Sequence, residues 1–179
     1  MATMIQAIRM ALHVGESRLG VTDIFGEDVG PPLGGVFTGT QGLETAWNTP
    51  LDERGIVGTA IGLALAGRKP VAEIQFCDYA FNTIDLLKLA GGLCWSSNGD
   101  WNCPMVVMTP VGSGIHGSHQ RYSHPALLPV AGVHITTTCH SYRCNLSHYS
   151  HYNQEHKKDR QQAWDFLVSN SIIHFTYKD

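Results

Sequence analysis

Strand-like and helical segments alternate along the first two thirds of the chain, and this alternation constrains the fold more than any other feature. Segments with the length and residue types of strands lie at residues 21–25, 70–76 and 105–110. Helical patterns lie before or between them, at residues 3–14, 53–66 and 80–94. Strands that alternate with helices favour a mainly parallel sheet with helices on both faces. We therefore predict a three-layer α/β fold.

The helix predicted over residues 53–66 carries a row of glycines at Gly55, Gly58 and Gly62. Glycine inside a helix costs roughly 1 kcal/mol relative to alanine. Repeated use of glycine there suggests that another backbone packs closely against the groove that these residues leave. We expect this helix to be buried.

The composition of the chain changes near residue 117. All but one of the 19 glycines lie at or before Gly117, whereas nine of the ten histidines lie at or after His116. From residue 118 neither the helical nor the strand period is sustained, apart from a short amphipathic stretch at residues 163–168. We predict a domain over residues 1–117 and a divergent, His-rich tail over residues 118–179, on which we impose no secondary structure.

Charge and hydropathy exclude several classes of protein. A net charge of -3 gives no basic stripe of the kind that binds nucleic acid. No apolar run approaches the ~20 residues that a membrane helix needs, and the first residues do not resemble a signal or transit peptide. Five cysteines without a CxxC pair indicate reduced thiols. We expect a cytoplasmic protein, or a mitochondrial matrix protein if the source is eukaryotic.

Two segments carry candidate chemistry. Asp52 and Glu53 stand at the predicted start of a helix, where acids commonly complement the helix dipole. Glu73 and Gln75 share one face of a strand that is otherwise apolar. Such a polar face needs partners, which are either ordinary hydrogen bonds to a neighbouring element or a bound cofactor at the strand end.

Other motifs are weaker. Residues 112–117 match G-x-G-x-x-G, but the acid that a dinucleotide site needs ~20 residues later is missing. Residues of the tail could supply two thiolates and two imidazoles to zinc, in a spacing that is compressed for a zinc finger: Cys139, Cys144, His148 and His151. No G-x-S-x-G elbow indicates a hydrolase.

Five blocks of the first 117 residues, taken in order, resemble the beta subunit of the thiamine-diphosphate-dependent decarboxylase component of 2-oxo acid dehydrogenases. The branched-chain 2-oxoisovalerate type resembles the chain most, and pyruvate and acetoin members share much of the pattern. The blocks are Gly26-Glu-Asp-Val-Gly30, Gly34-Gly-Val-Phe37, Asn48-Thr-Pro-Leu-Asp-Glu-Arg-Gly-Ile-Val-Gly-Thr-Ala-Ile-Gly62, Pro70-Val-Ala-Glu-Ile-Gln-Phe-Cys-Asp-Tyr79 and Trp101-Asn-Cys-Pro-Met-Val-Val-Met-Thr-Pro110.

This resemblance implies a transketolase-like pyrimidine-binding domain. Glu53 matches the family's activating glutamate, which hydrogen-bonds the aminopyrimidine ring and favours the imino tautomer that deprotonates the thiazolium. Leu51, Gln75 and Tyr79 match positions that line the cofactor pocket, and Glu27 matches an acid near it.

The resemblance also implies partners. In the family, the active site lies between alpha and beta subunits of a heterotetramer, and the alpha subunit holds the diphosphate and magnesium. A lipoyl-bearing acyltransferase receives the acyl group. The chain is therefore expected to need an alpha subunit for activity.

Several positions depart from the family pattern. The family's catalytic histidine is displaced or absent, because its position aligns with Arg121; His119 is the candidate substitute. Thr38 and Met108 stand where arginines are usual, and we expect the chain to lack the family's C-terminal assembly domain. Three hypotheses therefore stay open. The chain is a working beta subunit, a catalytically dead remnant or binding module, or a small zinc-binding protein built on the tail.

Overall fold

The computed structural model describes residues 4–32, 37–111, 133, 137–138 and 174–176. The main sheet in this part of the chain has four strands in the order β2-β1-β3-β4, and each neighbouring pair is parallel. The strands are β1 (Asp23–Gly26), β2 (Ala46–Asn48), β3 (Pro70–Glu73) and β4 (Val106–Met108). Because all four run in one direction, their carboxyl ends lie along one edge of the sheet.

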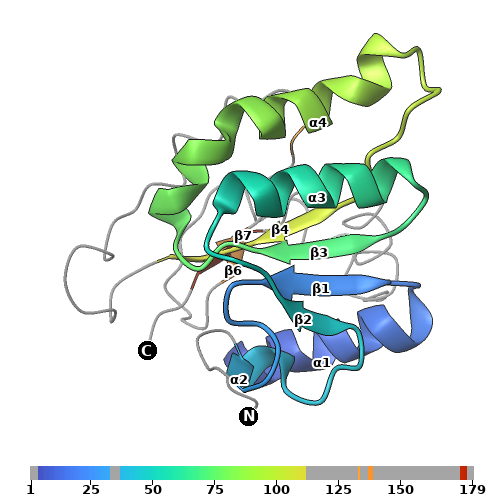
Figure 1. The fold of residues 1–179 in the computed structure, drawn as a ribbon. Helices are drawn as coiled ribbons and strands as arrows, with labels where there is room; N and C mark the ends of the chain where they lie inside the picture. The colour runs from blue at the N-terminus through green and yellow to red at the C-terminus, as the bar shows by residue number, and fades with distance from the viewer. Residues whose placement is uncertain (1–3, 33–36, 112–132, 134–136, 139–173, 177–179) are drawn as a thin grey trace.

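Helices cover both faces of this sheet (Figure 1). On one side lie α1 (Met4–Arg18) and the short α2 (Phe37–Thr40). On the other lie α3 (Glu53–Leu65) and, after the 3-10 helix η1 (Cys77–Thr83), α4 (Ile84–Ser96). The predicted three-layer α/β fold with a parallel sheet is confirmed.

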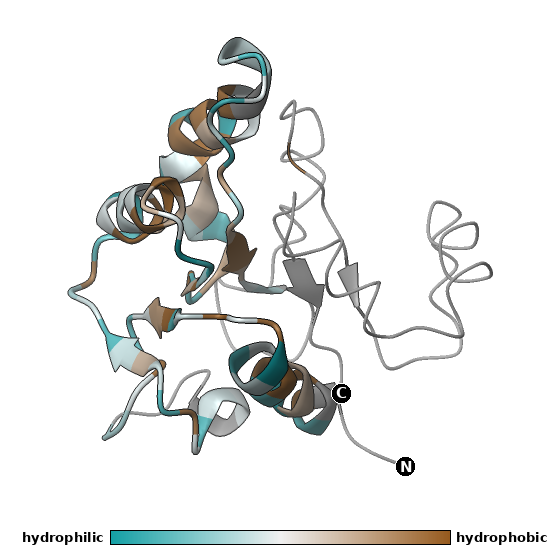
Figure 2. Cartoon of the chain, turned by 90° about the vertical axis from the view of Figure 1, so that its right-hand side faces the viewer, coloured by the Kyte–Doolittle hydropathy of each residue, from teal (hydrophilic) through white to brown (hydrophobic). Residues whose placement is uncertain are grey.

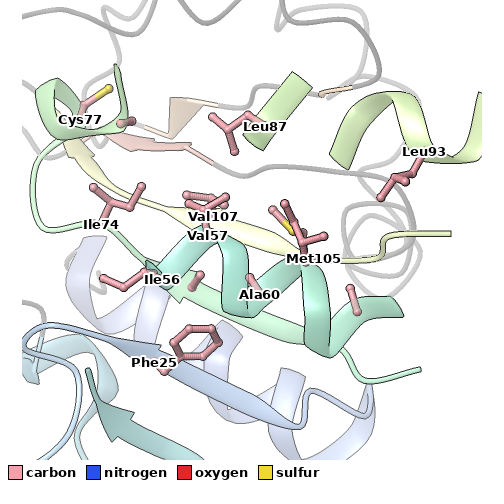
Figure 3. Close-up of a cluster of buried hydrophobic side chains, with 14 residues drawn as sticks. Phe25, Ile56, Val57, Ala60, Ile74, Cys77, Leu87, Leu93, Met105 and Val107 are labelled. Carbon is pink, nitrogen blue, oxygen red and sulfur yellow. The ribbon is translucent and has the colours of Figure 1, made fainter. Parts of the chain in front are cut away.

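Each face of the sheet packs its own hydrophobic cluster, because alternate residues of a strand point to opposite faces. Phe25, Ala72 and Val107, which pair in register, belong to the larger cluster under α3 and α4. Figure 3 shows Val57 and Ala60 of α3 near the strand side chains of this cluster. The second cluster joins strand residues to α1, whose Leu12 is fully buried. In Figure 2 the helices carry both hydrophobic and hydrophilic residues, as helices with one covered face do.

The main differences from the sequence-based prediction are short elements and element ends. Strand β2 and helix α2 were not predicted, because they lie between residues 30 and 50, where glycines and prolines interrupt the chain and neither period is sustained. Helix α1 continues to Arg18 rather than ending at residue 14. Strand β3 ends at Glu73, three residues before the predicted end, and η1 occupies the start of the helix predicted over residues 80–94.

The glycine groove of α3 does not contact another backbone within the described residues, so that expectation is wrong for this part of the chain. A Cβ added at Gly58 or Gly62 would meet no atom within 4 Å. The helix buries its other side instead, through Ile56, Val57, Ala60, Ile61 and Ala64. The helix is thus half-buried, and its aliphatic residues form the side that packs against the core.

A second, smaller parallel sheet has the order β5-β7-β6. It joins β5 (Pro110–Val111) to β6 (Thr137–Thr138) and β7 (His174–Thr176). Two strands therefore lie in the tail on which no secondary structure was predicted. Strands of two or three residues arise from pairing with a neighbour, which a local period cannot reveal. The stretch at 163–168 lies outside the described residues.

No helix among the described residues is long and apolar enough to cross a membrane. Cys77 and Cys103 are free thiols. The four residues of the zinc hypothesis, Cys139, Cys144, His148 and His151, lie outside the described part of the chain, as do His119 and Arg121.

Candidate functional site

Residues from three segments meet at the carboxyl edge of the main sheet. Glu27 directly follows β1, Gln75 follows β3 by two residues, and Glu53 begins α3 five residues after β2. In open parallel sheets this edge is where ligands bind. The fold thus brings together residues that are up to 48 positions apart in the sequence.

The start of α3 is fixed by its own capping residue. Asp52 has extended backbone angles, and its Oδ1 accepts a hydrogen bond of 3.0 Å from the N–H of Gly55. Glu53 is the next residue, half-buried in the first turn. Asp52 is therefore the helix cap, and Glu53 is the acid of the first turn, where a carboxylate complements the helix dipole.

Asn48 ties the loop after β1 to the end of β2. Its side-chain oxygen accepts hydrogen bonds from the N–H groups of Val29 (2.9 Å) and Gly30 (2.6 Å). Its amide nitrogen donates to the carbonyl of Gly30 at 3.0 Å. This clamp holds the segment that carries Glu27 beside the segment that leads to Glu53. Sequence reasoning assigned no role to Asn48, although an asparagine at a strand end is a usable signal.

Gln75 is positioned by Asp28, because its Nε2 donates a hydrogen bond of 2.8 Å to Asp28 Oδ2. Ordinary hydrogen bonding to a neighbouring element thus accounts for Gln75, one of the two interpretations that the sequence left open. Asp28 was not among the predicted site residues.

Glu73 does not find such a partner. Its side chain is 0% exposed, and neither carboxyl oxygen makes a hydrogen bond within the described residues. It lies against Gly26, where an added Cβ would be 2.4 Å from Glu73 Oε2 and 2.7 Å from its backbone oxygen. Only glycine fits at this point of β1.

Burial raises the pKa of Glu73 to about 8, and the Glu27 carboxylate adds to the shift by repulsion. The backbone N–H of Glu27 opposes the shift, although its geometry falls short of a hydrogen bond. The pKa of Glu27 is raised as well, first by burial and then by the charges of Glu53 and Asp28. The edge is therefore acidic and partly withdrawn from water.

The two remaining predicted residues differ in their surroundings. Tyr79 lies in η1, partly buried, with its ring edge-on to Phe76 at 5.5 Å between centroids. Leu51 is 76% exposed, immediately before the α3 cap. Met108, which stands where the family usually has an arginine, is buried in the second hydrophobic cluster.

These groups fit one part of thiamine diphosphate better than the other. Buried carboxyls without partners and a carboxylate at a helix start can exchange protons with ring nitrogens, as an aminopyrimidine requires. In contrast, no three His, Cys, Asp or Glu side chains of the described residues gather closely enough to hold a metal ion. The described residues thus fit the pyrimidine end of the cofactor.

Residues 1–145 match the family described as the transketolase pyrimidine-binding domain. The chain is 41% identical over 130 residues to the 2-oxoisovalerate dehydrogenase subunit beta of Pseudomonas aeruginosa, a match that covers 69% of this chain and 37% of the relative. It is 40% identical over 123 residues to the pyruvate dehydrogenase E1 component subunit beta of Bacillus subtilis, covering 64% of this chain and 37% of that protein. The chain therefore spans little more than a third of the length of these relatives.

A solved structure titled "Split gene transketolase, inactive beta4 tetramer" is similar in fold, with a TM-score of 0.56 over 95% of this chain and 50% of that chain. The sequence identity is 17%, so this likeness concerns the fold alone. The resemblance to 2-oxo acid dehydrogenase beta subunits, first noted in five sequence blocks, is confirmed by the curated relatives. With its parallel sheet, its acidic carboxyl edge and a family match over residues 1–145, the chain belongs to the transketolase pyrimidine-binding domain family.

Proposed function

We propose that the chain acts as the beta subunit of a thiamine-diphosphate-dependent 2-oxo acid dehydrogenase and supplies the pyrimidine half of a site shared with an alpha subunit. The observation that carries the proposal is the convergence of Glu53, Glu27 and Gln75 at one edge of the parallel sheet, in a chain about 40% identical to such subunits.

In this proposal Glu53 is the catalytic residue. Its carboxyl group would exchange a proton with a ring nitrogen of the aminopyrimidine, from the fixed position that the Asp52 cap gives to the start of α3. When bound, thiamine diphosphate supplies the nucleophilic carbon that attacks the 2-oxo carbon of the substrate.

The other edge residues would hold the ring in place. Gln75, oriented by its bond to Asp28, offers a fixed amide, and Tyr79 would line the ring pocket. Leu51 would contact the apolar side of the ring; its large exposed fraction suits a surface that a second subunit completes. Glu27 would lie behind Glu53, whose charge already acts on it.

The partners follow from the half-site. The alpha subunit would hold the diphosphate and magnesium, and the acyl product would pass to a lipoyl-bearing acyltransferase in the cytoplasm. We propose a branched-chain substrate such as 2-oxoisovalerate, with pyruvate or acetoin as alternatives, since relatives of two substrate types match about equally well.

A second candidate is a catalytically dead remnant or binding module that keeps the alpha-facing surface. It is favoured by Arg121, which stands at the position of the family's catalytic histidine.

Both candidates are tested by co-expressing the full chain with the alpha subunit of a curated relative and purifying the complex. Decarboxylation of 2-oxoisovalerate and pyruvate is then measured with and without thiamine diphosphate. The test variant is Glu53→Gln, and Glu44→Gln, an exposed acid in the loop before β2, is the matched control.

Turnover that is lost in Glu53→Gln and kept in Glu44→Gln would support the enzyme. A stable complex without turnover would support the binding module, and the absence of any complex would exclude both. The ratio of rates with the two substrates assigns the substrate type.

A further inference from the structure

The edge of the sheet contains two buried carboxyl groups that have no counter-charge among the described residues. Glu73 is fully buried, Glu27 is 8% exposed, and all four of their carboxyl oxygens are buried without a hydrogen bond among the described residues. A buried carboxylate in this situation costs several kcal/mol, so such groups take up a proton instead.

No described basic group is among the charges that act on Glu27 or Glu73. The two ion pairs among the described residues engage Arg54 with Asp85 and Arg68 with Asp23. Lys69 donates to the carbonyl of Leu19 at the opposite end of the sheet.

The charged groups that face this pair are all acidic. The loop after β1 brings Asp28, and the start of α3 brings Glu53, whose charge repels Glu27. On the other side of β3, strand β4 contributes only apolar residues, and the hydroxyl of Thr109 that follows it is buried without a partner. Repulsion by the described acids and burial therefore both disfavour a second negative charge on the pair.

The packing also decides which carboxyl takes the proton. Glu73 lies flat against Gly26, where even a methyl group would not fit, and it has no exposed surface. Glu27 retains a small exposed fraction and stands next to the loop that leads to solvent-exposed residues. Charge is less costly on Glu27 than on Glu73.

We infer that Glu73 and Glu27 hold a single proton at neutral pH, carried mainly by Glu73, and that Glu73 thereby acts as a positioning residue that leaves Glu27 as the one charged member of the pair behind Glu53. The inference deepens the proposed function, because Glu27 and Glu53 belong to the proposed cofactor half-site. The protonation itself is a property of the chain and needs no cofactor.

The test is a titration of the full chain labelled with ¹³C in the glutamate side-chain carboxyl groups, followed by NMR from about pH 4 to about pH 9. One carboxyl should titrate near pH 8, far above the others. Its signal should disappear in Glu73→Gln. In Glu27→Gln its midpoint should fall, because the repulsion by Glu27 is gone, whereas Glu44→Gln should leave it unchanged.

Titration of every glutamate below about pH 6 would overturn the inference. A high midpoint that persists in Glu73→Gln would overturn the assignment to Glu73, and one that does not move in Glu27→Gln would overturn the pairing. If Glu73→Gln does not fold, the shift in Glu27→Gln decides alone. Because the titration uses neither an alpha subunit nor thiamine diphosphate, its failure is distinguishable from failure of the proposed function.

Discussion

Two buried acids lie at opposite ends of the same parallel sheet, and within the described residues one of them has a counter-ion and the other has none. Asp23, at the amino end of β1, is 5% exposed, and its Oδ2 forms an ion pair of 2.9 Å with Nε of Arg68, although the contact lacks hydrogen-bond geometry. Glu73, at the carboxyl end of β3, has no cation within reach among the described residues. The amino end is thus neutralised by the fold, whereas the carboxyl end keeps uncompensated polar groups.

The difference indicates where the fold sacrifices stability. A chain selected only for stability would pair or replace a buried acid, because an unpaired one destabilises the folded state. Uncompensated buried acids concentrate at functional sites. We therefore expect substitutions of acids at the carboxyl edge to impair function without a matching loss of stability.

The largest expected effect is that of Gly26→Ala, which tests how closely the two strands approach at the acidic end. The new Cβ would lie 2.7 Å from the backbone oxygen and 2.8 Å from Cβ of Glu73, and neither atom can rotate away. We expect a loss of about 3 kcal/mol in the free energy of unfolding, measured by urea denaturation. Gly58→Ala is the control; its Cβ meets nothing within 4 Å, so stability should be kept or raised. Equal stability of both variants would contradict the close contact.

The next effect concerns the pH dependence of stability. The pKa of folded Glu73 is raised from 4.5 to about 8, so the folded state holds a proton that the unfolded state has released. Stability is therefore greatest below the unfolded pKa and is lost as pH rises towards 8, by at most about 1.4 kcal/mol per pH unit. Urea denaturation at several pH values should show this loss in the parent chain and a flatter profile in Glu73→Gln. Parallel profiles would contradict it.

At the paired end, Arg68→Met should leave Asp23 buried without its counter-ion. Because the Arg68 side chain is 47% exposed, solvent screens part of the interaction, and we expect a loss of about 1–2 kcal/mol. The double variant Asp23→Asn with Arg68→Met should recover most of it, which a double-mutant cycle by thermal denaturation would measure. Additive losses would show that the two residues are not coupled.

The smallest effect is expected for Arg54→Met, which removes a surface ion pair. Arg54 makes two hydrogen bonds to the Asp85 carboxylate, at 2.6 and 2.8 Å, but both side chains are well exposed. The guanidinium lowers the pKa of Asp85 to about 2. The pair therefore stabilises the fold above pH 4, and this contribution is lost as pH falls towards 2. Denaturation should show a smaller difference from the parent chain than Arg68→Met does, and the difference should vanish near pH 2.

Much of the central fold could be predicted from the sequence because its signals are local. A parallel α/β domain is predicted from local patterns alone. These are the apolar segments of β1, β3 and β4 and the spacing of aliphatic residues in α3. The acids at the start of α3 were also visible, since capping depends on neighbouring residues only. Strands β2, β6 and β7 were not predicted, because their segments carry no sustained strand pattern and form strands only by pairing with a neighbour.

The candidate site divides in the same way. Glu53, Glu27 and Gln75 were identified from sequence blocks that resemble a known family, and the structure brings their segments to one edge. The hydrogen bonds of Asn48 and the bond from Gln75 to Asp28 join residues 18 or more positions apart, so no local sequence pattern predicts them. The boundary predicted at residue 117 stays a prediction, and the family match extends to residue 145.

The sequence by itself determined the family, the parallel sheet and the residue types at its edge, because these depend on periodicity and on motifs that are continuous along the chain. Only the tertiary structure decided that, in the part of the chain that it describes, Asp23 has a counter-ion and Glu73 has none. Both are acids in apolar strands, with the same local pattern. Whether a cation reaches a buried acid depends on which distant segments pack beside it, and that is a property of the folded chain.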